Sequence, residues 1–371
     1  AVCGESIGFK NATHLYIAIS KLQSELEILV ENHPEWRKNA IAFTNRYINE
    51  GLRDRALTRD LDWGISVPKE GYENKTIYIW AENVLGYLSA SRVAVEENTN
   101  AFSELWGEDA KHYYVHGKDN IPFHTIILPA LLLGNGGAWH LPDQIVSSEY
   151  LTLEGRKIST SQNYAIWVKD LVGNYEADSI RYYFIANGPE KKDADFSWRE
   201  YVHSHNGELL GAYGNFVNRT LAFIEKYCDG IVPQGINTVE LDNQIESLYI
   251  AVGKLIESGY FKDAINEIFD FVRSANKFFD TEQPWITRNT NRIACDNTLY
   301  QCVQIIANLA VLLSPFLPFS SEKVLKWLNI SNKWEKQHVA SGYLLPEVAI
   351  LFQRIDKKVI EVETEKLKAI L

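Results

Sequence analysis

The sequence contains very little sulfur. Among its 371 residues there is no methionine, not even at the first position, and the four cysteines are Cys3, Cys228, Cys295 and Cys302. These cysteines lack the spacing of a disulfide framework, which is typical of small secreted domains. Zinc needs four ligands and Cys3 stands alone in its segment, so we expect no metal site in this chain. This cysteine usage predicts a cytoplasmic protein.

Long apolar runs and an excess of positive charge are also absent. No run reaches the roughly 20 residues of a membrane span, and no basic-then-apolar signal opens the chain, so we expect no membrane partner. The net charge of -11 argues against general affinity for nucleic acid, although a local basic surface is compatible with it. With 46% hydrophobic and 23% charged residues, the composition is typical of folded globular proteins, and the length of 371 residues predicts two or three domains.

Strand-like segments alternate with helical patterns in the first part of the chain. Residues 75–80, 111–115 and 144–146 are rich in β-branched and aromatic side chains, and helical spacing follows the first two. Such alternation predicts a parallel α/β sheet. Because ligands bind beyond the carboxyl ends of parallel strands, the polar loops after these segments are expected to meet at one sheet edge. The last of these loops, residues 157–161, offers an ammonium group, hydroxyls and backbone N–H groups to a polyphosphate, although a solvated loop has the same composition.

The second part of the chain has a different character. Long helical patterns cover residues 209–227, 241–258, 261–279, 298–313 and 320–328, with glycine or proline between them. This arrangement predicts a helix bundle. A charged amphipathic segment, residues 359–371, predicts one more helix.

Four motifs in this order resemble the methionyl-tRNA synthetase family of class I aminoacyl-tRNA synthetases. Residues 58–64 (TRDLDWG) match its T-R-D-L-x-W-G, and residues 78–87 (YIWAENVLGY) are similar to Y-V-W-x-D-A-x-I-G-Y. Residues 116–124 (HGKDNIPFH) are similar to I-G-K-D-I-x-x-F-H, and residues 157–161 (KISTS) to K-M-S-K-S. The H-I-G-H signature of the family does not occur, so we expect a fragment that lacks the amino-terminal half and is inactive in amino-acid activation by itself.

The resemblance implies an α/β part followed by an all-α part. The α/β part would be the second half of a Rossmann-like parallel nucleotide-binding sheet, and the all-α part a helix-bundle anticodon-binding domain. The implied domains are the remainder of a connective insertion (1–70), the second half of the Rossmann-like catalytic domain (71–152), the K-M-S-K-S-like loop with a stem-contact segment (153–200), and the bundle (201–371).

The activity implied by the resemblance is that of a methionine–tRNA ligase. Methionine would be activated by ATP, which enters with Mg²⁺, to methionyl-adenylate, and the methionyl group would pass to tRNA(Met). One alternative is a non-catalytic tRNA-binding module. Another is a class I synthetase for a different aliphatic amino acid, although the short span from Gly64 to Trp80 leaves no room for the editing insertion of those enzymes. A nucleotidyltransferase of the same superfamily would explain the loop but not the bundle.

For the nucleotide, the resemblance implies a catalytic loop and an ATP site. Lys157 would meet the charge that develops on the departing pyrophosphate, with Ser159, Thr160 and Ser161 beside it. Thr160 stands where the family has its second lysine. Asp119 would accept hydrogen bonds from the ribose hydroxyls, although aspartate also commonly caps a helix. The remaining implied ATP-binding residues are Gly117, Ser148 and Leu151.

For the amino acid and the RNA, the resemblance implies two further groups of residues. The amino-acid site would consist of Trp80, Asn83, Tyr87, Asn120 and His124, whose aromatic rings suit a thioether. Glu82, Asn83 and Asn120 replace the family's Asp, Ala and Ile. The anticodon site would consist of Asn215, Arg219 and Trp285. From the sequence alone, the aromatic residues and His124 are also compatible with an ordinary core, and Asn215 and Arg219 with an ordinary helix surface.

Overall fold

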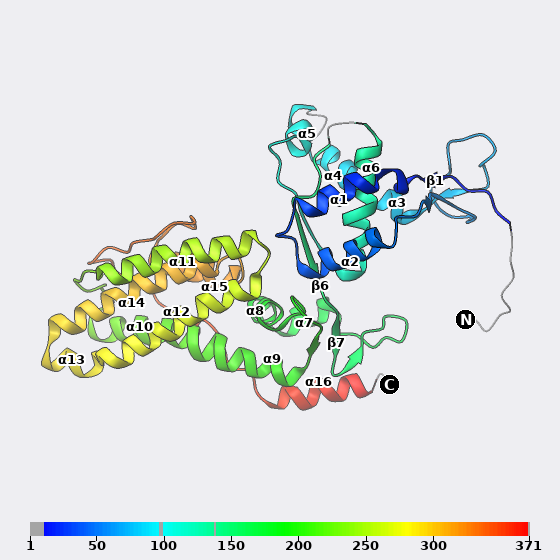
Figure 1. Cartoon of the computed structure of the whole chain (residues 1–371). Helices are drawn as coiled ribbons and strands as arrows, with labels where there is room; N and C mark the ends of the chain where they lie inside the picture. The colour runs from blue at the N-terminus through cyan, green and yellow to red at the C-terminus, as the bar shows by residue number, and fades with distance from the viewer. Residues whose placement is uncertain (1–10, 96–98, 137–138, 370–371) are drawn as a thin grey trace. The chain divides into compact units, whose positions relative to one another are not determined.

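The computed structural model describes residues 11–95, 99–136 and 139–369. The chain divides into two compact units, residues 1–148 and 149–371 (Figure 1). Each unit packs around hydrophobic cores of its own. This is expected, because a chain of this length is too long for a single core.

The centre of the first unit is a parallel pair of strands joined by a helical crossover. β5 (Tyr113–Gly117) lies beside β6 (Gln144–Ser148), with Gly117 opposite Ser148 at their carboxyl ends. Parallel strands need a long crossover connection. Here it contains a 3-10 helix, a π-helical turn and an α-helix: η2 (Lys118–Asn120), η3 (Phe123–Ile127) and α6 (Leu128–Gly134). The predicted strand–helix–strand alternation is confirmed for this pair.

Helices cover the strand pair of the first unit. The buried Trp36 indole lies between α1 and α2, and its N–H donates to the carbonyl of Asp143 at 2.8 Å, which fixes these helices to the start of β6. The other elements described in this unit are η1 (Ile19–Leu22), α1 (Gln23–Glu31), α2 (Lys38–Asn49), α3 (Ile79–Asn83), α4 (Gly86–Ala94), α5 (Thr99–Trp106) and the antiparallel pair β1 (Tyr16–Ile17) with β2 (Arg55–Ala56).

The prediction of a buried strand at residues 75–80 in the same parallel sheet is wrong. Only β4 (Thr76–Ile77) is extended, and it pairs antiparallel with β3 (Thr58–Arg59) rather than with β5 or β6. The chain enters α3 at Ile79, and the Ile79 and Trp80 side chains are 51% and 40% exposed. β-branched and aromatic content favours a strand because such side chains pack well on a half-buried sheet, and this segment is not buried in that way.

The second unit opens with a small sheet that carries the Lys157 loop. Its strand order is β8–β7–β9, where β7 is Leu151–Leu153, β8 is Arg156–Lys157 and β9 is Ala194–Phe196. Glu154 and Gly155 form the two-residue turn between β7 and β8 with positive φ angles of 47° and 75°, as a type I′ hairpin requires. The connection from β8 to β9 contains α7 (Val168–Asn174) and α8 (Ala177–Asn187).

The rest of the second unit is the predicted helix bundle. Its central helix, α14, is buried at every residue from Thr298 to Leu313. The Asn291 side chain accepts a hydrogen bond from the N–H of Ala294 and caps this helix at its start. The bundle elements are α9 (Trp198–Ser204), the π-helical η4 (His205–Gly214), α10 (Asn215–Tyr227), α11 (Val239–Glu257), α12 (Phe261–Glu282), α13 (Pro284–Thr290), α14 (Arg292–Leu313) and α15 (Pro318–Leu328).

After α15 the chain returns along the bundle without regular structure. We call residues 331–357 the returning segment. Side-chain amides fix it: the buried Gln304 accepts from the N–H and donates to the carbonyl of Val339, both at 2.9 Å. Asn206 makes the same pair of bonds with the backbone of Ile355, at 2.9 and 3.0 Å. The segment leads into α16 (Lys358–Lys368), which packs against α9.

Candidate functional site

An aromatic stack connects α3 to the π-helical turn of the first unit. The rings of Trp80 and Phe123 lie 5.0 Å apart between centroids, with 23° between their planes. Because Trp80 is 40% exposed, part of its indole is open to a ligand. Offset stacking of this kind fixes the orientation of the indole. Trp80, predicted from the sequence, is thus held by Phe123, a partner that the sequence analysis did not select.

Next to this stack, Tyr87 and His124 form a hydrogen-bonded pair. The Tyr87 hydroxyl lies 2.8 Å from His124 Nε2, and His124 Nδ1 lies 2.9 Å from the carbonyl of Asn120. A carbonyl only accepts, so Nδ1 carries the proton and Nε2 accepts from the Tyr87 hydroxyl. Burial lowers the pKa of His124, which keeps the imidazole neutral at pH 7.

A second histidine lies on the ring of His124. The two imidazoles are 4.4 Å apart between centroids and 15° from parallel, and His116 Nδ1 lies 3.0 Å from the carbonyl of Gly117. Burial, with smaller contributions from His124 and Arg37, lowers the pKa of His116 to about 4. His116 was not among the predicted site residues, because alternating strand residues give no signal for a stack with a residue of the next helical segment.

This stack predicts that the first unit loses stability in mild acid. The unfolded chain, with a histidine pKa of about 6.5, takes up the proton before the folded one does. The contribution of His116 is therefore constant above pH 6.5 and falls as the pH drops towards about 4. We expect His116→Phe, which keeps a ring in place, to remove about 2 kcal/mol of this acid destabilisation. Amide exchange of β5, measured between pH 4.5 and 7.5, tests this; identical pH profiles for both proteins would contradict it.

Phe123 also lines a cavity of about 380 Å³. We call it the Asp119 cavity. Its lining includes Asp119 from η2 and Arg59 from β3, together with Tyr78 and Phe123. The Arg59 guanidinium carbon lies 3.7 Å from the centre of the Tyr78 ring. One aspartate, two arginines and four aromatic residues thus line one cavity, a combination suited to a nucleoside.

The other residues predicted for the nucleotide and amino-acid sites belong to several elements. Gly117 and Ser148 face each other at the carboxyl ends of the two strands. Asn120 contributes its carbonyl to His124, and Asn83 is exposed at the end of α3. Leu151 belongs to β7 of the second unit.

The Lys157 loop is a closed turn of the second unit. Ser159 and Tyr164 exchange two backbone hydrogen bonds, at 3.0 and 2.9 Å, and the hydroxyls of Ser159 and Ser161 lie 3.2 Å apart. Thr160 is exposed at the tip. The Lys157 side chain is exposed, and among the described residues its ammonium has no ion-pair partner. This loop therefore offers one uncompensated cation beside several hydroxyls.

In the bundle, two of the predicted RNA-reading residues pack on one ring. The Arg219 guanidinium lies 3.9 Å from the centre of Phe279, and the Trp285 ring lies 6.0 Å from it. Arg219 is also paired with Asp280 at 2.5 Å, which the sequence analysis did not anticipate. Trp285 is 41% exposed, and Asn215 is exposed one helical turn before Arg219. These side chains can offer stacking and hydrogen bonds to unpaired bases.

Within residues 11–95, 99–136 and 139–369, His, Cys, Asp and Glu side chains form no group of three or more that could hold a metal ion. Cys3 lies outside these described residues. In the same part of the chain, every helix is too short or too polar to cross a membrane.

Comparison with known proteins identifies both parts of the chain. Residues 1–221 match the family described as tRNA synthetases class I (M), and residues 240–370 match the anticodon-binding domain of tRNA ligase. The methionine–tRNA ligase of Bacillus cereus (strain Q1) is 53% identical over 371 residues, which cover 99% of this chain and 68% of the relative. Methionine–tRNA ligase 1 of Alkaliphilus oremlandii (strain OhILAs) is 50% identical over 368 residues, with the same coverage of both proteins.

Solved structures show the same fold. Mycobacterium tuberculosis methionyl-tRNA synthetase in complex with methionyl-adenylate aligns with a TM-score of 0.83 at 24% identity, covering 93% of this chain and 69% of that one. Its apo form aligns with a TM-score of 0.80 at 23% identity, covering 92% and 68%. The predicted Rossmann-like synthetase domain followed by a helical anticodon-binding domain is confirmed.

The two alternative functions are not favoured by these comparisons. A non-catalytic module does not account for a class I synthetase match over residues 1–221, and the relatives named above act on methionine rather than on another aliphatic amino acid. The four motifs, between residues 58 and 161, all lie within the family match over residues 1–221. The chain therefore belongs to the methionyl-tRNA synthetases, a family of class I aminoacyl-tRNA synthetases.

Proposed function

We propose that the first unit holds the methionine and adenosine groups of the methionine–tRNA ligase reaction. The observation that carries this proposal is that Phe123 and His124, consecutive residues of one π-helical turn, hold two predicted site residues. Phe123 stacks on Trp80, and His124 accepts a hydrogen bond from Tyr87. The same turn borders the cavity that contains Asp119. The exposed indole face of Trp80 suits the methionine thioether, because sulfur packs favourably against aromatic rings. The Asp119 carboxylate would accept the ribose hydroxyls of ATP.

The activation step requires a cation close to the departing pyrophosphate. A carboxylate oxygen of methionine attacks the α-phosphorus of ATP, and the bond to the pyrophosphate breaks. Negative charge then grows on the departing pyrophosphate. ATP would enter the site together with Mg²⁺. Lys157 would meet this charge, with Ser159 and Ser161 as further donors and Thr160 without the charge of the family lysine. The Lys157 ammonium, which is exposed and has no ion-pair partner among the described residues, supports this role.

The finer divisions of the chain follow from the same proposal. Residues 71–152 would be the second half of the catalytic domain, with Gly117 and Ser148 near the nucleotide. Residues 153–200 would contact the acceptor stem, and residues 201–371 would read the anticodon of tRNA(Met) through Asn215, Arg219 and Trp285. We place the protein in the cytoplasm, and no zinc is needed by any of these steps.

Calorimetric titration of the chain with methionine and with ATP tests the site in the first unit. We expect Trp80→Ala to weaken methionine binding roughly 3- to 10-fold, since sulfur–aromatic contacts contribute up to about 1.5 kcal/mol. Trp63→Ala is the matched control, because Trp63 is 84% exposed. We expect Asp119→Asn to weaken ATP binding about tenfold and to leave methionine binding unchanged. Equal methionine affinities of the Trp80 and Trp63 variants would reject this site.

A further inference from the structure

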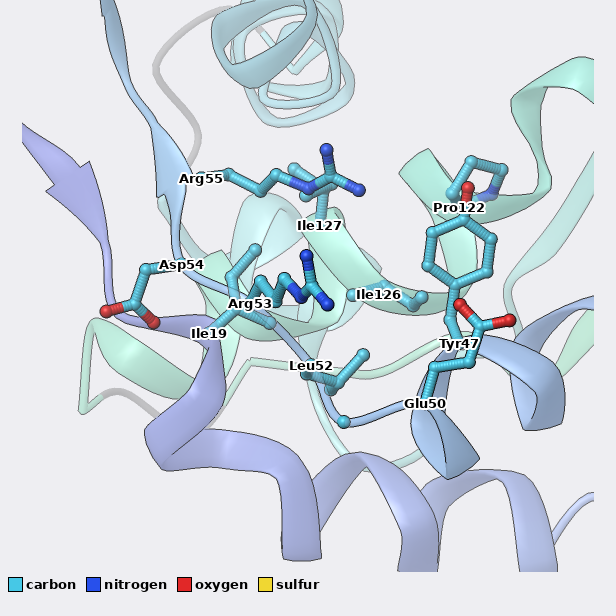
Figure 2. Close-up of a pocket in the computed structure, with 11 residues that line it drawn as sticks. Ile19, Tyr47, Glu50, Leu52, Arg53, Asp54, Arg55, Pro122, Ile126 and Ile127 are labelled. Atoms are coloured by element: carbon cyan, nitrogen blue, oxygen red, sulfur yellow. The ribbon is translucent and has the colours of Figure 1, made fainter.

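Two arginines that the proposed reaction does not use line a second cavity of the first unit. Its volume is about 390 Å³, and Arg53 and Arg55 both extend into it from the loop after α2 (Figure 2). Among the described residues, neither guanidinium has a hydrogen-bond or ion-pair partner. The apolar part of the lining consists of Ile19, Leu52, Pro122, Ile126 and Ile127. We call this second cavity the arginine cavity.

The loop that carries the two arginines is held from its other side. Asp54 points away from the cavity and accepts hydrogen bonds from the Ser20 N–H at 3.1 Å and the Ser20 hydroxyl at 2.7 Å (Figure 2). Successive side chains of an extended segment alternate in direction, so Arg53 and Arg55 share the opposite side. The Arg55 backbone is paired with Ile17 in the β1–β2 ladder. The two guanidinium groups are therefore positioned by fixed backbone.

The lining of the arginine cavity contains two arginines and two acids, but it is the two arginine side chains that extend into the cavity (Figure 2). Of the two acids in its lining, Asp54 points away from the cavity and accepts a hydrogen bond from the Ser20 hydroxyl. Glu50 lies beside Tyr47, on the wall away from the arginines (Figure 2). Two arginines that have no hydrogen-bond or ion-pair partner among the described residues favour an anion as the ligand. A guanidinium fits a phosphate particularly well.

The arginine cavity adjoins the Asp119 cavity. The two share Tyr47, Arg55, Pro122 and Ile127 as lining residues. The Tyr47 ring is partly exposed and belongs to an aromatic group in which its centroid lies 5.0 Å from that of Phe43. Cationic side chains beside an accessible aromatic ring are typical of surfaces that bind single-stranded nucleic acid.

We propose that the arginine cavity binds phosphodiester groups of the single-stranded 3′ end of tRNA, with Tyr47 available to a base. This inference rests on the proposed function, in which the Asp119 cavity takes the adenosine of the adenylate and Lys157 meets the phosphates of ATP. In the transfer step, a hydroxyl of the terminal ribose bonds to the methionyl carbonyl carbon. The bond from that carbon to AMP breaks, and the proton leaves with AMP. The RNA end must therefore reach the surroundings of the adenosine, where this second phosphate site lies.

The test compares two forms of tRNA(Met) on the full 371-residue chain. Fluorescence anisotropy measures the affinity for intact tRNA and for tRNA without its unpaired 3′ nucleotides, over a range of salt concentrations. For the double variant Arg53→Gln, Arg55→Gln we expect roughly tenfold weaker binding of intact tRNA at low salt and a log–log salt slope reduced by about 1.4. Binding of the truncated tRNA should be unchanged. The charge-matched control is Lys38→Gln with Arg92→Gln, two exposed residues elsewhere in this unit.

Three results would overturn the inference. Equal losses for intact and truncated tRNA would place the contact elsewhere on the RNA. A loss of ATP affinity with unchanged tRNA affinity, measured by equilibrium dialysis, would assign the cavity to the phosphates of ATP. No effect beyond that of the control variant would leave the arginines without a role in binding. Normal ATP binding by Asp119→Asn would instead reject the proposed adenosine site, and the comparison of the two tRNAs would remain valid.

Discussion

Replacement of Trp285 by alanine is expected to weaken the binding of tRNA(Met) to this chain roughly 5- to 150-fold, because stacking of one base on an aromatic side chain contributes about 1–3 kcal/mol. Trp285 is 41% exposed and leans on Phe279, which fixes its ring before any RNA binds. A ring that is already ordered loses little side-chain entropy on binding. Fluorescence anisotropy with tRNA(Met) gives the change directly.

The chain offers a matched control for this variant. Trp334 is also 41% exposed and also rests on an aromatic ring, that of Tyr249, elsewhere in the second unit. We expect Trp334→Ala to leave the affinity unchanged and Trp285→Phe to recover most of the loss. If both alanine variants bound tRNA(Met) equally well, or if a tRNA with a different anticodon lost the same affinity, Trp285 would not read the anticodon.

The largest effect on stability is expected at Asp178. This buried carboxylate on α8 accepts hydrogen bonds from the N–H and the hydroxyl of Ser320, both at 2.6 Å, and from the N–H of Phe319. It thereby caps the start of α15, whose own N-cap residue, Leu317, has no side-chain acceptor. We expect Asp178→Ala to lower the free energy of unfolding by about 3 kcal/mol, because buried donors lose a charged acceptor. Urea unfolding measures the loss.

Thr238→Ala is the reference for this experiment. Thr238 caps α11 from within its own segment, through a 3.1 Å bond from the N–H of Leu241. Removing such an ordinary cap costs about 1 kcal/mol. Amide exchange should show the effect of Asp178→Ala at the start of α15 and along α8. A loss no larger than that of Thr238→Ala would mean that water replaces the carboxylate, contrary to the burial of this group.

The bundle was predictable because its helices are long and regularly patterned. Every helix expected between residues 209 and 328 is present, and the boundaries differ mainly where a cap or a π-helical turn intervenes. Asn291 lets α14 begin at Arg292, ahead of its apolar stripe. The π-helical stretch before Asn215 has no counterpart in simple hydrophobic spacing, because its period differs from that of an α-helix.

Only the site residues that belong to local sequence motifs were predictable. Trp80, Tyr87 and His124 were selected from motifs, but Phe123, Tyr114 and His116, which fix their rings, act through contacts between separate segments. Such partners leave no periodic signal in the sequence. The expected strand at residues 75–80 failed for a related reason: an apolar run predicts a strand only if a neighbouring strand pairs with it, and here the partner, β3, is two residues long.

The same limit applies to the bundle surface. The four-residue spacing of Asn215 and Arg219 predicts a shared helix face. It does not reveal that Asp280, on another helix, holds the Arg219 guanidinium at 2.5 Å. An RNA base that takes this guanidinium must compete with that carboxylate. If Arg219 reads the anticodon as proposed, this competition favours specificity over affinity.

The hydrogen bonds of the returning segment determine the order in which the molecule can be completed during synthesis. The Asn206 amide donates a hydrogen bond to the carbonyl of Ile355, and the Gln304 amide donates one to the carbonyl of Val339. Neither amide has this native partner until the later residue has left the ribosome. The first unit contains its own core and strand pair, and it can fold while the remainder is still being translated. A ribosome that stalls shortly before Val339 would therefore leave the side-chain amides of Asn206 and Gln304 without their native partners and open to chaperones.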